Sequence, residues 1–398
     1  MWDVIIVGAG PAGSCAAYHL ARKGARVLLA DRQAFPRDKV CGDGVSANGL
    51  ALLTEMGLAD WLAKEAFCEP RTLLLSAPNG QSVSIAYQPR GFSYGRTIPR
   101  FRLDEALLTC ATEAGAHFAA GYHIRHCERT NHPSIRVEGI QGGQTKTEEA
   151  RLAILAEGAQ AGLARLLGLV CTPPDLVAVR GYFSGAAEPD SLLEIHYHSS
   201  VSPGYVWIFP LGGGRVNVGL GTFVQRAKQG QTNLTAVLHR AMAESHPLKR
   251  RLGGSRPDGP IRGHSLRTGV GKARLCTDHV LVAGEAAHLV NPLTGEGIAA
   301  ALESGKKAAH QACLALHKGD FSRATLAPYE RAVRDRFLPE HRAALFIRRI
   351  FSHPAAVNRL VGKASSDSAF ARALGEAIIG TVPIQTLLRP AMIAKYLL

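Results

Sequence analysis

The sequence lacks any uncharged apolar run of the roughly 20 residues that a transmembrane helix needs. The nearest approach, residues 377–388, contains Pro383 and is followed by Arg389. The first residues also lack the basic segment and small-residue cleavage site of a secretory signal. These absences argue against a multi-span membrane protein and predict a cytoplasmic one, with peripheral contact at a membrane left open.

The eight cysteines form no CxxC pair and show no metal-ligand spacing, so we expect reduced thiols and no metal site. The chain also lacks basic runs interleaved with aromatics and any zinc-finger or RNA-binding signature, so we expect no nucleic-acid partner. The formal net charge of +14 indicates either an anionic partner, such as an acidic membrane surface or a phosphorylated ligand, or a solvated cationic surface.

Glycine, by contrast, is in excess, with 42 in 398 residues against a background of about 7%. A β-branched run typical of a buried parallel strand precedes the G-x-G-x-x-G motif of Gly8, Gly10 and Gly13. The helix predicted over residues 12–21 directs its N-terminus and the glycine backbone at a phosphate. Asp31 closes the next strand, where a carboxylate takes ribose hydroxyls. This unit predicts a Rossmann-type dinucleotide site without separating FAD from NAD.

A second predicted strand, residues 279–283, is followed by Gly284-Glu285 and by a helix expected to begin near Ala299. The unpaired backbone N–H groups before this helix, around Gly295 and Gly297, suit the electron-rich edge of an isoalloxazine ring. The sequence contains no later strand–GxGxxG–helix unit, so we expect one dinucleotide and no separate nicotinamide-binding domain.

In this second segment the sequence resembles the FAD-dependent superfamily typified by p-hydroxybenzoate hydroxylase, whose fingerprint there is Gly-Asp, then small residues, Pro and Gly. The resemblance implies that Glu285, in place of the usual aspartate, binds the ribityl chain. It places Arg100, or alternatively Arg102, beside the FAD phosphates, and Gly158 at the flavin; Glu157 stands where the hydroxylases carry an aspartate. The cofactors implied are FAD and, as reductant, NAD(P)H or another electron donor.

Three segments are similar to geranylgeranyl reductases, namely residues 36–45, 204–210 and 291–297. In that family a P-x-x-K-x-C-G segment lies against the flavin, and a Y-x-W-x-F-P strand lines the pocket for an isoprenoid chain. The cofactor residues we expect are Gly8, Gly10, Ala12, Gly13, Asp31, Arg32, Cys41, Gly42, Arg100, Gly158, Glu285, Pro292, Gly295, Gly297 and Ile298, and the pocket residues are Tyr205, Trp207 and Phe209.

The residue patterns themselves allow two interpretations of these segments. Cys41 lies in a glycine loop with basic neighbours, where its thiol either acts on the flavin or a proton, or is a small residue packed on the ring. Tyr205, Trp207 and Phe209 alternate and so share one face of a strand, as a pocket wall or as plain sheet core. The candidate catalytic residues are Cys41 and, second, Tyr205.

The predicted fold class is α/β, with a Rossmann-type FAD-binding domain, an inserted antiparallel β-sheet substrate domain and a helical C-terminal segment. The FAD-binding domain comprises residues 1–68, 96–170 and 265–320, the substrate domain 69–95 and 171–264, and the C-terminal segment 321–398. Basic residues among apolar ones in the last segment either dock to anionic lipid or belong to helices that cap the core. His196 and His198 share a strand face without a third metal ligand in view.

The resulting functional hypothesis is an FAD-dependent oxidoreductase that reduces C=C bonds of an isoprenoid or related lipid by hydride transfer from flavin N5. A hydrophobic small-molecule or lipid substrate is the expected partner. The alternative is an FAD-dependent monooxygenase that hydroxylates an aromatic or polyketide-like substrate. A flavin-binding sensor or carrier is a third class, although no segment resembles an output domain.

Overall fold

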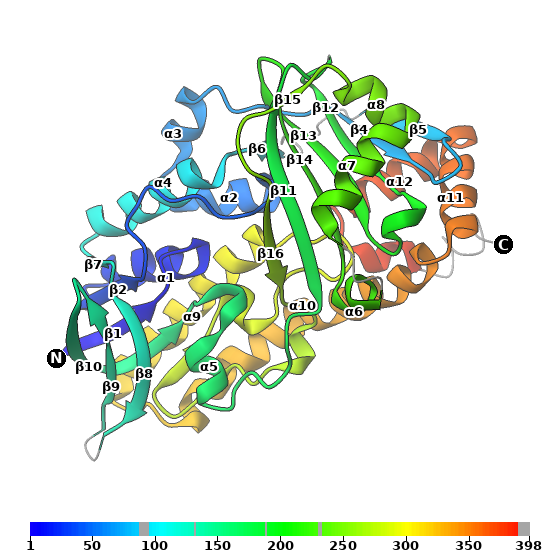
Figure 1. Ribbon diagram of the computed structural model, residues 1–398. Helices are drawn as coiled ribbons and strands as arrows, with labels where there is room; N and C mark the ends of the chain where they lie inside the picture. Colours follow the sequence, from blue (N-terminus) through cyan, green and yellow to red (C-terminus); the bar gives the residue numbers. More distant parts are fainter. Residues whose placement is uncertain (87–94, 131–132, 188, 230–232, 389–398) are drawn as a thin grey trace.

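The chain forms two large β-sheets, with a helical layer at one end of the molecule (Figure 1). The computed structural model describes residues 1–86, 95–130, 133–187, 189–229 and 233–388. No helix among these residues is long and apolar enough to span a membrane. The mixed α/β architecture agrees with the predicted fold class.

The first sheet has the strand order β17-β18-β10-β1-β2-β7, with β8 and β9 attached to β10. Strand β1, strand β2, strand β18 and the last part of β10 pair in parallel, and their side chains are mostly apolar and buried, as is typical of a parallel sheet. The strands are β1 (Trp2–Val7), β2 (Val27–Asp31), β7 (His117–Ala120), β8 (His123–Arg129), β9 (Ile135–Gln141), β10 (Gln144–Leu155), β17 (Cys276–Thr277) and β18 (Val280–Val282).

The helices of this half include α1 (Pro11–Ala21) and α9 (Ile298–Lys318), which pack closely on each other. A Cβ placed on Gly305 of α9 would lie 2.2 Å from the Ala12 carbonyl oxygen, so glycine permits the close approach. A Cβ on Gly284 would likewise lie 2.8 Å from Ala12 Cβ, so the second predicted cofactor segment begins against the start of α1. The other helices here are α2 (Ala47–Glu55), α3 (Ala59–Lys64), α4 (Arg100–Glu113) and α5 (Gly162–Leu166).

The second sheet has the order β15-β11-β14-β13-β12-β4-β5, with β16 on β11. All its pairs are antiparallel except β12 with β4, which joins the early insertion to the later one. The strands are β4 (Thr72–Ser76), β5 (Ser82–Ala86), β11 (Leu176–Ser184), β12 (Leu192–His196), β13 (Tyr205–Gly212), β14 (Arg215–Phe223), β15 (Arg256–Pro257) and β16 (Arg262–Leu266), and β3 (Gly44–Ser46) and β6 (Gly95–Thr97) form a separate ribbon. The domain boundaries stay a prediction.

Strand β13 divides its side chains between two environments. Val206 and Ile208 pack into a core shared with α7 (Leu234–Glu244) and α8 (His246–Leu252), while the intervening aromatics face a cavity. The sequence analysis did not predict these two helices or α6 (Val224–Gln229). The C-terminal segment is helical as predicted, with α10 (Arg323–Phe351), α11 (Pro354–Ser366) and α12 (Ser368–Ile378) packed on β4 and β5. Residues 389–398 lie outside the described residues.

Candidate active site

A cavity of about 1200 Å³ runs from the end of β1 to the C-terminal helices. Of the residues predicted for the site, all but Gly13 line it. A Cβ on Gly13 would lie 1.8 Å from the Gly8 carbonyl oxygen, so Gly13 serves the packing of helix on strand. Arg100 lines the cavity, whereas Arg102 pairs with Glu65 outside it.

One end of the cavity is formed by the turn between β1 and α1. Gly8 has φ +101°, and a Cβ there would lie 2.4 Å from the Ala156 carbonyl oxygen, so glycine is required. Helix α1 begins at Pro11 without a side-chain cap, which leaves its first N–H groups unpaired by side chains. Asp31 accepts hydrogen bonds from Ala9 N (2.8 Å) and Gln33 N (2.9 Å) and so fixes the turn.

A cluster of charges lies beside this turn. Arg37 Nη1 is 2.8 Å from Asp104 Oδ2, and Arg100 donates to the two oxygens of the same carboxylate at 2.9 and 2.7 Å. Two guanidinium groups therefore share one fully buried acid, and Arg37 Nη2 also lies 3.9 Å from Asp31 Oδ2, so two cations face two acids beside the helix N-terminus. Arg37 Nη2 is 3.7 Å from where a Cβ on Gly10 would lie. Arg37, which we had not predicted to bind a phosphate, is thus the arginine nearer the glycine turn.

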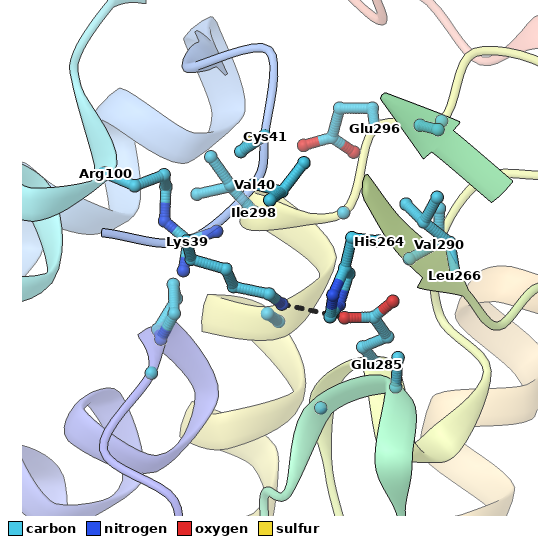
Figure 2. Close-up of a pocket in the computed structure, with 18 of the residues that line it drawn as sticks. Lys39, Val40, Cys41, Arg100, His264, Leu266, Glu285, Val290, Glu296 and Ile298 are labelled. Atoms are coloured by element: carbon cyan, nitrogen blue, oxygen red, sulfur yellow. Dashed lines mark hydrogen bonds and ion pairs between the residues drawn. The ribbon is translucent and has the colours of Figure 1, made fainter. Parts of the chain in front are cut away.

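Further along the cavity, Lys39 reaches Glu285, with His264 beside them (Figure 2). Lys39 Nζ is 2.8 Å from Glu285 Oε2, whereas the buried Glu285 Oε1 and His264 Nε2 have no hydrogen-bond partner among the described residues. Burial opposes ionisation of Glu285, but the Lys39 ammonium holds its pKa below the ordinary value. Burial and Lys39 also lower the pKa of His264, so the imidazole is neutral. The free oxygen and nitrogen suit a polyhydroxylated ligand.

The loop that carries Cys41 is attached to the second sheet by two buried side chains. Arg180 Nε (3.1 Å) and Asn217 Nδ2 (2.8 Å) donate to the Cys41 carbonyl oxygen. Asn217 Oδ1 in turn accepts from Trp207 Nε1 at 2.9 Å. Arg180 also forms an ion pair with Asp38 at 2.8 Å. These contacts hold the Cys41 loop in register with the aromatic strand.

Tyr205, Trp207 and Phe209 form a continuous wall of the cavity. Ring centroids are 6.1 Å apart for the first two and 6.3 Å apart for the last two. A Cβ on Gly42 would lie 3.0 Å from the Phe209 ring, which explains the glycine after Cys41. Beyond the aromatic rings the walls are aliphatic, formed in part by Leu73, Leu193, Ile195, Leu293, Ile378 and Ile379.

The candidate proton carriers of this region are protonated at neutral pH. Burial raises the pKa of the Cys41 thiol and of the Tyr205 phenol. Tyr205 donates its hydroxyl hydrogen to the Thr294 carbonyl oxygen, so its proton is engaged. Cys41 keeps a neutral thiol at the cavity wall, which is inconsistent with a nucleophilic thiolate.

Glu157 and His196, both noted in the sequence analysis, are hydrogen-bonded within the protein. Glu157 accepts from Leu163 N (2.8 Å) and Ala164 N (3.0 Å), so it caps α5. His196 is buried between Ser76 and Glu194, while His198 is half-buried after the end of β12 and contacts Ser200 Oγ at 2.7 Å. The described residues contain no group of three or more side chains placed to hold a metal.

Comparisons with known proteins agree with this geometry. A family model described as "FAD binding domain" matches residues 1–337. The chain is similar to a menaquinone reductase from Mycobacterium tuberculosis, with 35% identity over 77% of this chain and 75% of the relative. It is also similar to digeranylgeranylglycerophospholipid reductase 2 from Methanopyrus kandleri, with 31% identity over 88% and 87%.

A solved structure shares the whole fold. It is a geranylgeranyl bacteriochlorophyll reductase-like protein from Thermoplasma acidophilum, with a TM-score of 0.83, 23% identity, and coverage of 97% of this chain and 98% of that one. Fold, site and relatives together define an FAD-dependent oxidoreductase. The chain belongs to the FAD-binding domain family and, within it, to the geranylgeranyl reductases, which confirms the resemblance noted from the sequence.

Proposed function

We propose that this enzyme reduces C=C bonds in the isoprenoid chain of a lipid or quinone substrate. The observation that carries the proposal is the continuity of one cavity. It passes from the glycine turn at Gly8, along the Cys41 loop, to a slot walled by Tyr205, Trp207 and Phe209 and then by aliphatic side chains. A long apolar chain fits such a slot.

The names of the relatives support recognition of the substrate's isoprenoid tail rather than of its headgroup. One relative is named for menaquinone and others for digeranylgeranylglycerophospholipid. These two molecules differ in their polar parts and share a polyprenyl tail. A slot built from apolar walls selects that common part.

The unpartnered polar atoms fit FAD at the other end of the cavity. When bound, FAD supplies the hydride for such a reduction, and NAD(P)H or another donor is the proposed reductant. Gly8, Gly10 and the start of α1, with Arg37 beside them, would hold the diphosphate. Glu285 Oε1 and His264 Nε2 would take hydroxyl groups of the ribityl chain, since both are buried without a partner among the described residues.

The protein's own contribution to the reaction is orientation, exclusion of water and a proton. Trp207 and Phe209 would hold the alkene against the Cys41 loop, which Arg180 and Asn217 keep in place. Cys41 holds its proton on Sγ at the cavity wall and is the proposed donor. Tyr205 ranks second because its hydrogen is already given to Thr294. No contact in the described part of the chain favours the hydroxylase alternative.

An anaerobic single turnover tests the proposal. The purified protein is reduced with dithionite, oxygen is excluded, and a polyprenyl lipid is added. We expect the absorbance of oxidised flavin to return and the lipid to gain two hydrogens. Recovery only after air is admitted, with a hydroxylated product, would overturn the proposal.

A matched pair of variants tests the proton donor in the same assay. Cys41→Ser removes the proposed donor, whereas Cys313→Ser changes a half-buried cysteine of α9 that does not line the cavity. Unaltered lipid reduction by Cys41→Ser would remove Cys41 from the mechanism and leave the proposed reaction standing.

A further inference from the structure

The C-terminal helices carry a stretch without negative charge. Residues 341–366 contain no aspartate or glutamate, although they include Arg342, Arg348, Arg349, Arg359 and Lys363. The stretch covers the end of α10 from His341 onward and all of α11. Figure 1 shows α11 at the outer edge of the molecule, at the end away from the N-terminus.

The outer side of these two helices combines charge with an exposed aromatic ring. Phe346 is 51% exposed and, with the apolar side chains of Ile350 and Leu360, lines a hollow of about 700 Å³. Arg349 and Arg359 also line the hollow and have no acidic partner within 4.0 Å among the described residues. We call Phe346, Arg349, Ile350, Arg359, Leu360 and Lys363 the basic hollow.

Not every cation of the stretch is available. Arg348 stacks on Phe223 at 4.1 Å, and Lys363 Nζ is 3.8 Å from Asp367. Arg349 and Arg359, by contrast, are exposed residues. The two arginines are therefore the main charges of the basic hollow.

The inner side of the same helices packs against side chains that line the substrate end of the cavity. Ile347, Phe351 and Val357 pack in one apolar cluster with the cavity-lining Leu73 and Ile195. The helices and this apolar cluster thus lie between the basic hollow and the apolar slot.

We propose that the basic hollow docks this enzyme onto an anionic phospholipid bilayer. Guanidinium groups pair with lipid phosphates, and an aromatic ring amid cations is the combination that enters the interface between headgroups and acyl chains. A nucleic acid would engage the charges but would gain nothing from the apolar hollow. The inference rests on the proposed function to the extent that a lipid substrate gives such docking its purpose.

Vesicle sedimentation of the full-length holoprotein tests the docking. Vesicles of equal parts phosphatidylglycerol and phosphatidylcholine are compared with pure phosphatidylcholine, at low and high salt. We expect binding to the anionic vesicles alone, released by salt because the surface charges are screened. Equal binding to neutral vesicles, or preference for duplex DNA over the anionic vesicles, would overturn the proposal.

A triple variant, Phe346→Ser with Arg349→Gln and Arg359→Gln, localises the contact. Each cation near an anionic membrane raises the binding affinity roughly fivefold, so removal of the two arginines alone should lower the affinity for anionic vesicles by about 25-fold. The control is Leu314→Ser with Lys23→Gln and Lys318→Gln, which removes an exposed apolar residue and one exposed cation on α9 and one exposed cation in the turn after α1. Equal vesicle binding by both triple variants would contradict the assignment.

Turnover of a detergent-solubilised polyprenyl substrate separates this inference from the proposed function. We expect the basic-hollow variant to keep the wild-type rate there and to lose rate when the substrate is in anionic vesicles. If the wild type binds vesicles through the hollow but reduces no polyprenyl lipid, the proposed function fails and the docking surface stands.

Discussion

Replacing Gly219 with alanine would create a steric clash with Trp207 in the aromatic wall. A Cβ at this position lies 2.1 Å from Cζ2 of Trp207, so the indole must retreat by about 1.3 Å to reach 3.4 Å. That movement breaks the 2.9 Å bond from Trp207 Nε1 to Asn217, which also holds the Cys41 carbonyl. Overpacking costs about 1–3 kcal/mol and the lost hydrogen bond about 1 kcal/mol, so we expect a loss of roughly 2–4 kcal/mol of unfolding free energy.

Gly221→Ala is the matched control, because its Cβ would lie 3.8 Å from the Trp207 ring, an ordinary contact. Urea unfolding followed by tryptophan fluorescence compares the two variants with the wild type. Gly219→Ala should also raise KM for a polyprenyl substrate, since the displaced indole narrows the slot. If Gly219→Ala were as stable as Gly221→Ala, the packing of Trp207 described above would be refuted.

Two further predictions concern ionisable side chains. Glu285→Ala removes the unpartnered Oε1 and leaves Lys39 without its ion pair. On the usual strength of a charged hydrogen bond, the Kd for FAD should rise about 10- to 100-fold. Flavin fluorescence on the apoprotein measures this Kd, and an unchanged value would contradict the assignment. Burial lowers the pKa of His341 from 6.5 to about 4. The contribution of His341 to the free energy of unfolding is therefore complete above pH 6.5, and roughly 3 kcal/mol of it is lost as the pH falls to about 4. His341→Gln, which retains an acceptor for Val270 N, should flatten this part of the stability profile in urea unfolding, and an unaltered profile would show that His341 is not its source.

The parts of the fold that could be predicted are those with a local signal. The β1, α1 and β2 unit is contiguous, so one glycine motif and one apolar run define it. Strands β13 and β14 were evident from alternation and a glycine turn. Helices α7 and α8 were missed although a signal was present: Asn233 caps α7, and Leu234, Leu238 and Ala241 recur at helical spacing along its buried face.

Site residues that belong to a sequence motif could be predicted, whereas residues that reach the site only through long-range contacts could not. Arg180 and Asn217 meet the Cys41 loop across more than a hundred positions of sequence, and neither belongs to a recognisable pattern. His264 lies in strand β16, and nothing in its neighbours marks the unpartnered nitrogen. Long-range hydrogen bonds depend on the sheet packing, which sequence spacing does not encode.

Native mass spectrometry of the purified protein, before and after incubation with FAD, tests the central claim most directly. The glycine turn, Arg37 and the free oxygen of Glu285 predict one tightly held FAD per chain in the wild type. The same measurement should show mostly apoprotein for Glu285→Ala at low FAD. A colourless wild-type protein that takes up no FAD under any loading condition would contradict the account.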